Sequence, residues 1–249
     1  MTFRYKLTLE YDGAGFIGWQ RQAVGVSVQS ALEDAALKFS GAEAATGAAG
    51  RTDTGVHALG MVAHIDLVRA YDPDTVRKAL NFYMKPHPVA VLEASPAPAG
   101  FHARFSALER RYLYRIFNHP SPPVLDRHRV WWVSNPLDEA AMTQGAAHLI
   151  GHHDFSTFRA GDCQAKSPFK TLDDLCVERC GHEIHIRARS RSFLHRQVRN
   201  MVGTLKMVGE GRWQPDDVKK ALIARARAAG GPTAPPQGLY FAGVSYEEG

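Results

Sequence analysis

The first residues of the chain alternate between polar and apolar side chains. From Phe3 to Leu9 every second residue is apolar, and arginine, lysine and threonine lie between. This period of two is typical of a half-buried strand. Asp12-Gly13 would end the strand, because these residue types favour turns.

After this strand, the apolar residues recur with the spacing of a helix. Ser27 can cap a helix in which apolar residues recur three or four positions apart, and Gly41 can end it. A second helix is expected to open at Asp72-Pro73, since proline suits the first turn of a helix.

The same two patterns recur along the rest of the chain. Strands are expected around residues 61–67, 89–92, 111–117, 172–178, 183–190 and 239–246. Helices are expected around residues 138–150 and 193–208, and another is expected to begin at Pro215. The segment His152-His153-Asp154 is expected to form an ordinary loop.

The segment from Ser95 to Gly100 has the composition of a linker. It divides the chain into an N-terminal half, residues 1–100, and a C-terminal half, residues 101–249. Both halves mix strand and helix patterns. This mixture predicts an α+β protein in which helices pack on mostly antiparallel sheet.

The composition is that of a globular protein. The 249 residues are 45% hydrophobic and 22% charged, a balance that disordered chains do not have. No apolar run approaches the ~18 residues of a membrane span, and the first residues do not form a signal peptide. The expected location is therefore the cytoplasm. Cys163, Cys176 and Cys180 are odd in number and clustered, so they indicate no disulfide framework.

Positive charge is concentrated in three stretches. The net charge is +5, and arginines cluster within residues 104–115, 127–129 and 187–199, with aromatic residues between them. Positive charge neutralises phosphates and flat rings stack on bases, which is the combination that favours binding of unpaired RNA. The alternative interpretation is a solvated basic face with no ligand.

The segment from Gly50 to Ala58 contains the main candidate for chemistry. Glycines flank Arg51 and Asp53, so the backbone can turn sharply and present both side chains together. The guanidinium would keep the carboxylate ionised, and an ionised carboxylate can act as a nucleophile or a general base. The alternative is a surface turn in which Asp53 accepts backbone hydrogen bonds.

A phosphate-binding loop is a further interpretation of this segment. Such a loop needs glycine, four residues, and then Gly-Lys-Ser/Thr. Here Ala45 stands where the first glycine belongs and Arg51 replaces the lysine. The fit is poor, so a nucleotide hydrolase is disfavoured and no nucleotide cofactor is expected.

Two other segments could complete a site. In an extended strand Tyr112 and Tyr114 share one face, where a ring can stack on an extruded base or pack in the core. In the helix expected at residues 193–208, Arg199 falls at the margin of an apolar face, with His195 one turn earlier on the same side. A guanidinium there needs an acidic partner, and Asp53 is the candidate.

A metal site is a possible interpretation of the late cysteines and histidines. Cys176, Cys180, His182 and His185 are ligand types that zinc accepts. Their spacing is tight, and alternation along a strand would direct His185 away from the other three. No metal is therefore expected.

In sequence order, several segments together resemble the tRNA pseudouridine synthase A (TruA) family. They are Leu7 to Gly13, Phe16 to Gln20, Ser27 to Gln29, Gly50 to Ala58, Phe101 to Ser106, Arg111 to Tyr114, Val198 to Gly203 and Ala234 to Leu239. Each segment is short, but the set spans nearly the whole chain. Thr54 departs from the family pattern, in which alanine is commoner after the aspartate, and residues 194–197 fall where the family varies.

The resemblance implies that Asp53 is catalytic, that Arg51 helps to displace or hold the RNA, and that Arg199 forms an ion pair with Asp53. It also implies that Tyr112 contacts the target base and that Leu239 lines the uracil pocket. The halves would be two α/β subdomains whose sheets join into one extended central sheet. Helices would pack on one side, with the catalytic cleft between the halves.

The reaction implied is the isomerisation of uridine to pseudouridine in the anticodon stem-loop of tRNA, at positions 38 to 40, without a cofactor. The base leaves the stack, the bond from N1 to C1′ breaks, the uracil rotates, and C5 joins C1′. The residues leave open whether Asp53 is a nucleophile or a base, and whether the intermediate is an acylal, an adduct to the base or a glycal. The resemblance further implies a homodimer with tRNA bound across both subunits. The rival function is a non-catalytic RNA-binding protein, which would not need Asp53.

Overall fold

The alternating residues at the start of the chain form strand β1 (Phe3–Tyr11), as predicted. In the computed structural model, which describes residues 2–247, the apolar side chains of Tyr5, Leu7 and Leu9 are buried. The residues between them are partly exposed. One face of the strand is therefore covered, as the period of two requires.

The chain divides into two compact units. The first comprises residues 2–108 and 240–247, and the second comprises residues 109–239. This division differs from the predicted halves, because the boundary lies at residue 108 and the end of the chain returns to the first unit. Ser95 and Pro96, assigned to a linker from their composition, instead continue a strand.

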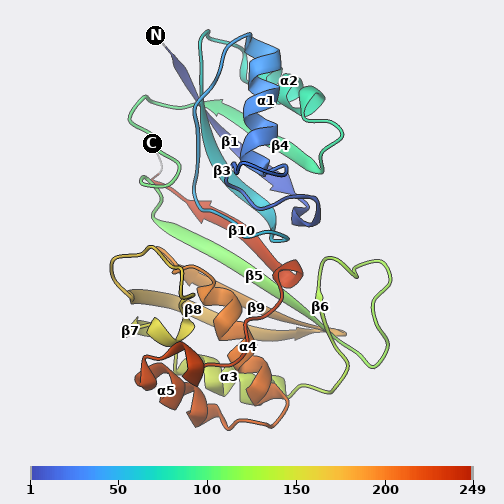
Figure 1. The fold of residues 1–249 in the computed structure, drawn as a ribbon, viewed down its shortest axis with the longest axis vertical. Helices are drawn as coiled ribbons and strands as arrows, with labels where there is room; N and C mark the ends of the chain where they lie inside the picture. Colours follow the sequence, from blue (N-terminus) through green and yellow to red (C-terminus); the bar gives the residue numbers. More distant parts are fainter. Residues whose placement is uncertain (1, 248–249) are drawn as a thin grey trace. The chain divides into compact units, whose positions relative to one another are not determined.

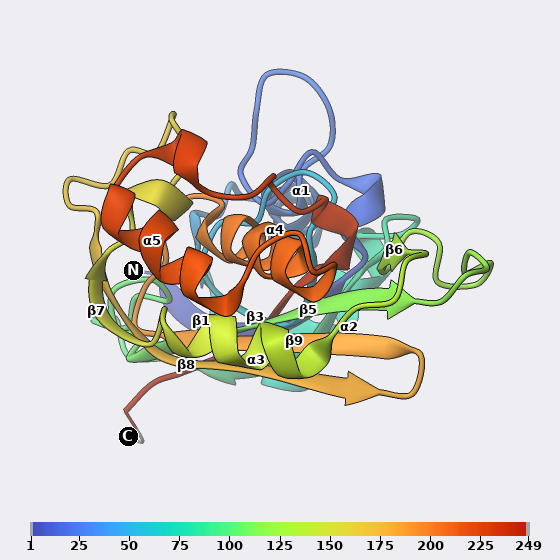
Figure 2. The ribbon, with the colours of Figure 1, turned by 90° about the horizontal axis from the view of Figure 1, so that it is seen from below.

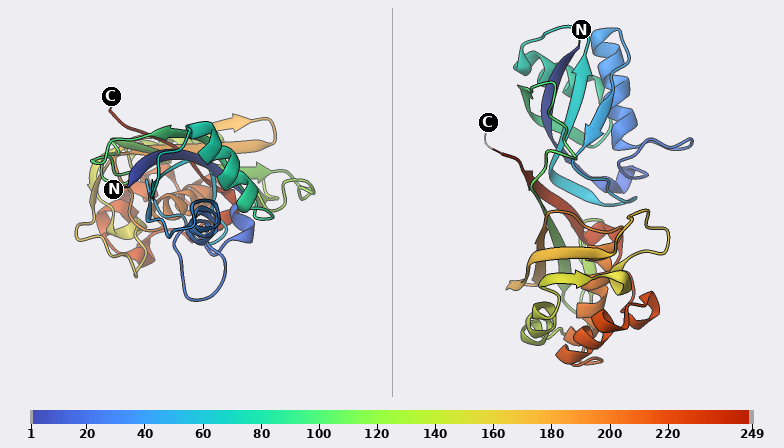
Figure 3. Two further views of the ribbon diagram at one scale, coloured as in Figure 1. Left: turned by 90° about the horizontal axis from the view of Figure 1, so that it is seen from above. Right: turned by 90° about the vertical axis from the view of Figure 1, so that its left-hand side faces the viewer.

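The first unit is a sheet with two helices on one face. Its strands lie in the order β4 (Val89–Pro96), β1, β3 (His57–Leu67) and β10 (Leu239–Ser245). The short strand β2 (Thr46–Ala48) pairs with β3 near the opposite end from β10. Pairing is antiparallel throughout except that β10 runs parallel to β3. Helices α1 (Val28–Ser40) and α2 (Pro73–Tyr83) contact each other over this sheet (Figures 1 and 3).

The predicted helix ends of the first unit are confirmed. The Ser27 hydroxyl accepts a hydrogen bond from the backbone N–H of Ser30, and Gly41 ends α1 with a φ of 75°. A left-handed residue at this position is the usual reason for a terminal glycine. Asp72 caps α2 by accepting from two backbone N–H groups, and Pro73 is the first helical residue.

The second unit is also a sheet with helices on one face. Its strands lie in the order β5 (Glu109–Asn118), β9 (Glu183–Ser190), β8 (Phe169–Cys180) and β7 (Gly151–Asp154), with β6 (Trp131–Val133) parallel to β5. Figure 2 shows helices α3 (Glu139–Ala147), α4 (Gln197–Gly209) and α5 (Pro215–Ala224) over one face of β8 and β9. Short 3-10 turns occur at Gly13–Gly15, Ser156–Phe158, Arg227–Ala229 and Pro236–Gly238.

Two further local predictions are wrong. The helix that carries Arg199 begins at Gln197 rather than near residue 193, because Arg196 adopts a φ of 60° that an α-helix cannot contain. His195 therefore does not share a helix face with Arg199, and its ring lies 3.0 Å from Asp162. Residues 152–154, expected in a loop, pair with β8 as strand β7.

The predicted α+β class is confirmed. The described residues contain ten strands and five α-helices, and most strand pairs are antiparallel. Within this described part, no helix has the length and apolar character needed to cross a membrane. The joining of the two sheets and the cleft between the halves stay predictions.

Helix α4 holds the segment after α5 by close backbone contact. The Thr204 hydroxyl accepts from the N–H of Gly231 at 2.9 Å, and the Thr233 hydroxyl donates to Asn200 at 2.7 Å. A Cβ atom at Gly203 would lie 1.7 Å from the carbonyl oxygen of Pro232. Only glycine allows this approach, so Gly203 is required by packing rather than by helix geometry.

Gly203→Ala should therefore destabilise the second unit. The added methyl group must displace the backbone at Pro232, and overpacking of this kind costs about 1–3 kcal/mol in the free energy of unfolding. Urea unfolding of the variant and the parent measures this loss of free energy. Gly161→Ala is the matched control, because a Cβ there meets nothing within 4 Å. Equal midpoints for the two variants would contradict the packing argument.

Candidate active site

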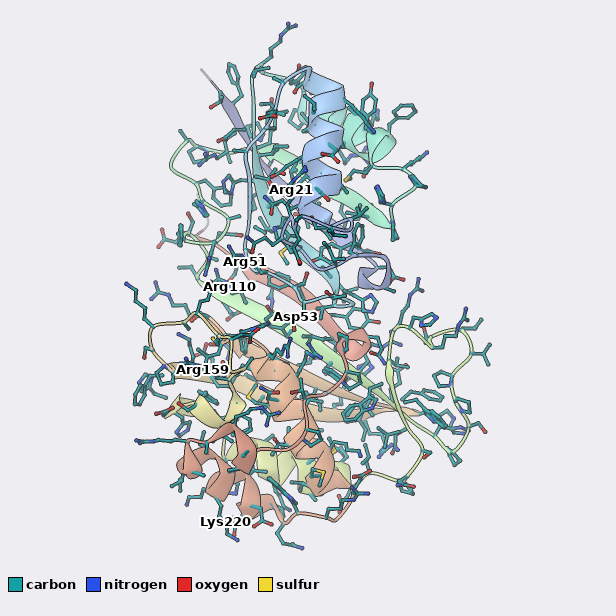
Figure 4. All side chains as sticks on the ribbon, viewed as in Figure 1. Arg21, Arg51, Asp53, Arg110, Arg159 and Lys220 are labelled. Atoms are coloured by element: carbon teal, nitrogen blue, oxygen red, sulfur yellow. The ribbon has the colours of Figure 1, made fainter. Side chains whose placement is uncertain are left out.

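Asp53 lies in a tight turn that leads into β3. Its carbonyl oxygen accepts a hydrogen bond from the N–H of Val56 at 3.1 Å, and Gly55 in this turn has a φ of 79°. The preceding residue, Thr52, is buried with its hydroxyl 2.9 Å from that of Tyr11. Asp53 itself is partly exposed, and Figure 4 labels it together with Arg51 on this segment. The turn thus fixes the backbone on both sides of the carboxylate.

A second loop, which contains residues 17–19, supports the turn. The N–H of Trp19 donates to the carbonyl oxygen of Thr52 at 3.0 Å. Gly18 has a φ of 102°, and a Cβ there would lie 2.6 Å from the same carbonyl oxygen. The hydroxyl of Thr54 donates to the carbonyl of Ile17 at 3.0 Å. Thr54 therefore adds a contact in place of the alanine that the family pattern favours.

His57 is the first residue of β3 and holds the start of this strand against the loop after β1. Its Nδ1 accepts a hydrogen bond from the N–H of Gly13 at 3.0 Å, and its ring stacks on Tyr240 with centroids 4.8 Å apart. A Cβ at Gly13 would lie 2.1 Å from the carbonyl oxygen of Val56. From the sequence, Gly13 is expected only to end a strand and His57 has no expected role, although both lie in segments that carry the family resemblance.

The second unit places Tyr112 and Tyr114 on one face of β5, as predicted. Tyr112 meets Phe193 edge-on, with ring centroids 5.0 Å apart. Tyr114 is fully buried and its hydroxyl donates to the carbonyl of Pro235 at 2.7 Å. Burial raises the pKa of the Tyr114 phenol well above its usual value, so this hydroxyl stays protonated.

Arg199 lies on α4 and is held by the segment that precedes β10. Its Nε donates to the carbonyl oxygen of Ala234 at 2.7 Å, and the N–H of Ala234 donates back to the Arg199 carbonyl at 3.0 Å. Leu239 follows in the same segment as the first residue of β10, with a buried side chain. The segment is close to β5 as well, since a Cβ at Gly238 would lie 2.6 Å from the ring of Tyr114.

The predicted site residues thus belong to two units. Arg51 and Asp53 belong to the first, whereas Tyr112, Arg199 and Leu239 belong to the second. The ion pair of Asp53 with Arg199, and the convergence of both with Tyr112, stay predictions.

The phosphate-loop interpretation does not fit the structure. Gly50 to Thr52 leads through the Asp53 turn into strand β3, not into a helix. A phosphate-binding loop depends on the N–H groups of the helix that follows it. Among the residues that the structure describes, no three His, Cys, Asp or Glu side chains are grouped to hold a metal ion.

Part of the predicted basic surface consists of ion pairs. On β9, Arg187 pairs with Glu178, and Arg189 pairs with Glu109 at 3.1 Å. Arg115 on β5 pairs with Glu183 at 2.7 Å. For these three arginines, the alternative interpretation of a solvated face describes the structure better than a phosphate-binding cluster.

Comparison with known proteins identifies the class of enzyme. Residues 8–106 and 146–247 match the model of a family described as tRNA pseudouridine synthase, an isomerase that acts on RNA. The chain belongs to this family.

The similarity extends over nearly the whole chain. It is 63% identical over 243 residues to a tRNA pseudouridine synthase A of Paramagnetospirillum magneticum, covering 98% of this chain and 95% of that protein. It is 60% identical to the protein of the same name from Rhodospirillum centenum, covering 98% and 99% respectively. A third such protein, from Rhodospirillum rubrum, is 57% identical and covered over 87% of its length, with 98% of this chain. The family resemblance inferred from the sequence is confirmed.

One buried histidine links β3 to the loop that follows β4. The Nδ1 of His64 accepts from the N–H of Ala103 at 3.2 Å, and its ring also bonds the backbone of Gly47. Burial lowers the pKa of His64 below its usual value, and the charge of Arg4 adds to this effect. Protonation would remove the acceptor for Ala103, so the fold favours the neutral ring.

Stability should therefore depend on the protonation of His64. Because its pKa is lowered by folding, the stabilisation is fully present above the unfolded value of about 6.5 and is lost as pH falls through the lower folded value. His64→Gln, which cannot titrate, should show a smaller fall in the free energy of unfolding between pH 7.5 and pH 5.5. Urea titrations at both pH values measure this difference. Equal slopes in the variant and the parent would refute it.

Proposed function

We propose that this chain converts uridine to pseudouridine in the anticodon stem-loop of tRNA, at positions 38 to 40, with Asp53 as the catalytic residue. The observation that carries the proposal is the Asp53 turn in a chain of the tRNA pseudouridine synthase family. The turn is held by backbone hydrogen bonds at Val56 and Trp19 and by the Thr54 hydroxyl on Ile17, while Asp53 is partly exposed. A preorganised carboxylate is what an attack at a nucleoside requires.

The chemistry is an isomerisation, so no atoms are gained or lost. The glycosidic bond from N1 to C1′ breaks, a new bond forms from C5 to C1′, the proton on C5 leaves, and N1 gains a proton. An ionised carboxylate can support these steps as a nucleophile or as a base. Neither role requires a cofactor.

The other site residues follow from this assignment. Arg51, exposed and two residues before Asp53, would hold or displace the RNA strand. Arg199 would pair with Asp53 and keep it ionised, while Tyr112 contacts the base and Leu239 lines the uracil pocket. In support, Arg199 on α4 donates to Ala234, and Leu239 ends the segment that begins at Ala234 and is also held by Tyr114 on β5. A shift of this segment would therefore move Leu239 and disturb the contact of Arg199.

The biological setting completes the proposal. Positive net charge of +5 suits a polyanionic substrate, and tRNA is found in the cytoplasm. A homodimer with tRNA bound across both subunits is proposed from the same family resemblance. Size measurement of the purified chain in solution addresses the dimer directly.

Asp53→Asn should abolish the reaction. Removing the ionisable carboxylate should lower the rate of pseudouridine formation by at least about a thousandfold, while tRNA affinity remains largely unchanged. Release of tritium from tRNA transcripts containing 5-tritiated uridine measures the rate, because C5 loses its hydrogen as it joins C1′.

Asp34→Asn is the matched control for this experiment. Asp34 is an exposed carboxylate in the same unit, paired with Arg21 on the surface, and its loss should leave the rate near that of the parent. Unimpaired tritium release by Asp53→Asn would remove the assignment of Asp53. The absence of release by the parent chain would remove the proposed function itself.

Arg199→Lys should also impair the reaction. Lysine keeps the charge but cannot donate from Nε to Ala234 while its other nitrogens reach a carboxylate. Loss of a charge-assisted hydrogen bond predicts a single-turnover rate about 10- to 100-fold lower. Arg212→Lys, an exposed arginine beside Glu210 in the same unit, is the control. A crystal structure with the Asp53 carboxylate far from the Arg199 guanidinium would contradict the pairing.

A further inference from the structure

A pocket lies in the first unit, beside the Asp53 turn. Its volume is about 260 Å³, slightly below the range of about 300–1,000 Å³ typical of small-molecule sites. Its lining includes Arg51 but not Asp53. The lining residues are Trp19, Gln20, Gln29, Thr46, Gly47, Ala48, Gly50, Arg51, His102, Arg104 and Phe105.

An exposed aromatic ring forms one side of the pocket. Phe105 is 75% exposed, and its ring lies against that of His102 with centroids 4.3 Å apart and planes 37° from parallel. The guanidinium of Arg104 lies 5.8 Å from the centre of the Phe105 ring. An exposed ring beside a guanidinium offers a surface on which a flat base can stack.

The loop that carries Phe105 is held in place from several directions. The N–H of His102 donates to the hydroxyl of Ser106 at 3.0 Å, and the N–H of Ser106 donates to the carbonyl of His102 at 2.9 Å. Tyr246 donates to the carbonyl of Ala103 at 2.8 Å, and His64 accepts from the N–H of the same residue. The loop is thus ordered in advance, which lowers the entropic cost of binding.

Another part of the pocket wall is polar. The Gln29 amide donates to Glu33 at 2.8 Å, and the Thr46 hydroxyl donates to the same carboxylate oxygen at 2.7 Å. These bonds hold both side chains to Glu33 on α1. Gly47 and Ala48 follow on β2, so backbone groups also line this wall.

The charge of the lining is positive. It contains two arginines, Arg51 and Arg104, and no aspartate or glutamate. Burial lowers the pKa of His102, with Arg4 contributing, so its ring is neutral at neutral pH. A ligand for this pocket therefore combines a flat apolar face, hydrogen-bonding edges and negative charge. A nucleotide has all three features.

We infer that this pocket binds an unpaired nucleotide of the RNA substrate other than the target uridine, with its base against Phe105 and its phosphate between Arg51 and Arg104. The inference rests on the proposed function, since that function supplies the tRNA. The target base must reach Asp53, which does not line the pocket. The pocket thus positions the RNA strand. Arg51 lines the pocket and is only two residues before Asp53, so it connects the pocket to the proposed catalytic turn.

Phe105→Ala in the full-length protein tests the stacking contact. Loss of one stacked base weakens binding of single-stranded nucleic acid by about 5- to 100-fold, and the dissociation constant for a fluorescent tRNA transcript should rise by this amount. Phe82→Ala is the matched control, because Phe82 is 66% exposed in the same unit and lies outside the pocket. Its affinity should equal that of the parent. Equal affinities for the Phe105 and Phe82 variants would overturn the inference.

Abasic transcripts identify the bound nucleotide. In a series that lacks one base of the anticodon loop at a time, one position should weaken binding to the parent but not to Phe105→Ala. That loss of coupling places the missing base on Phe105. Coupling at the target uridine, or at no position, would overturn the inference. Arg104→Gln should also reduce the dependence of affinity on salt by about one phosphate contact.

These outcomes are independent of the proposed reaction. Tritium release by the parent chain tests whether pseudouridine is formed, whereas the binding series requires no turnover. If the parent binds tRNA with the predicted Phe105 coupling but releases no tritium, the proposed reaction fails and the nucleotide pocket stands.

Discussion

The hydrogen bond from the N–H of Trp19 to the carbonyl of Thr52 is the contact on which the first unit's candidate site depends. It joins two loops whose backbones are so close that Gly18 has no room for a Cβ. One consequence is that Asp53, the next residue, cannot relax away from the sheet without breaking backbone contacts. The carboxylate is therefore positioned by main-chain packing, which side-chain motion alone does not disturb.

The second unit also contains a close backbone approach that only glycine allows. Gly203 allows the carbonyl of Pro232 to approach α4, and the paired hydrogen bonds of Arg199 with Ala234 lie next to this contact. Tyr114 holds the following residue, Pro235, from the strand side. Asp53 and Arg199 thus each lie beside a glycine-dependent backbone contact. Exposed ion pairs would give weaker control, since they contribute little and are screened by salt.

The sequence predicts the features that local residues determine. The alternation of β1, the Ser27 cap and the Gly41 end of α1 each depend on a few neighbouring residues, and each is confirmed. The late start of α4 depends on Arg196 in a left-handed conformation, which composition does not favour. Strands of three or four residues, such as β2 and β7, have too little pattern of their own, because their partners stabilise them. For the candidate site, the motif indicates Asp53, whereas its supports lie in distant segments whose contacts only a structure reveals.

Ion pairs within the protein also determine which arginine side chains can bind a phosphate. A phosphate that approached Arg187 or Arg189 would have to compete with a carboxylate already in contact, at Glu178 or Glu109. The first-unit pocket offers a different arrangement, because two arginines, Arg51 and Arg104, belong to one lining. The number of arginines in a cluster therefore overstates the positive charge that the cluster presents to a phosphate. Under the proposed function, a few preorganised contacts beside the Asp53 turn would position the strand, so a moderate net charge would suffice for a polyanionic substrate.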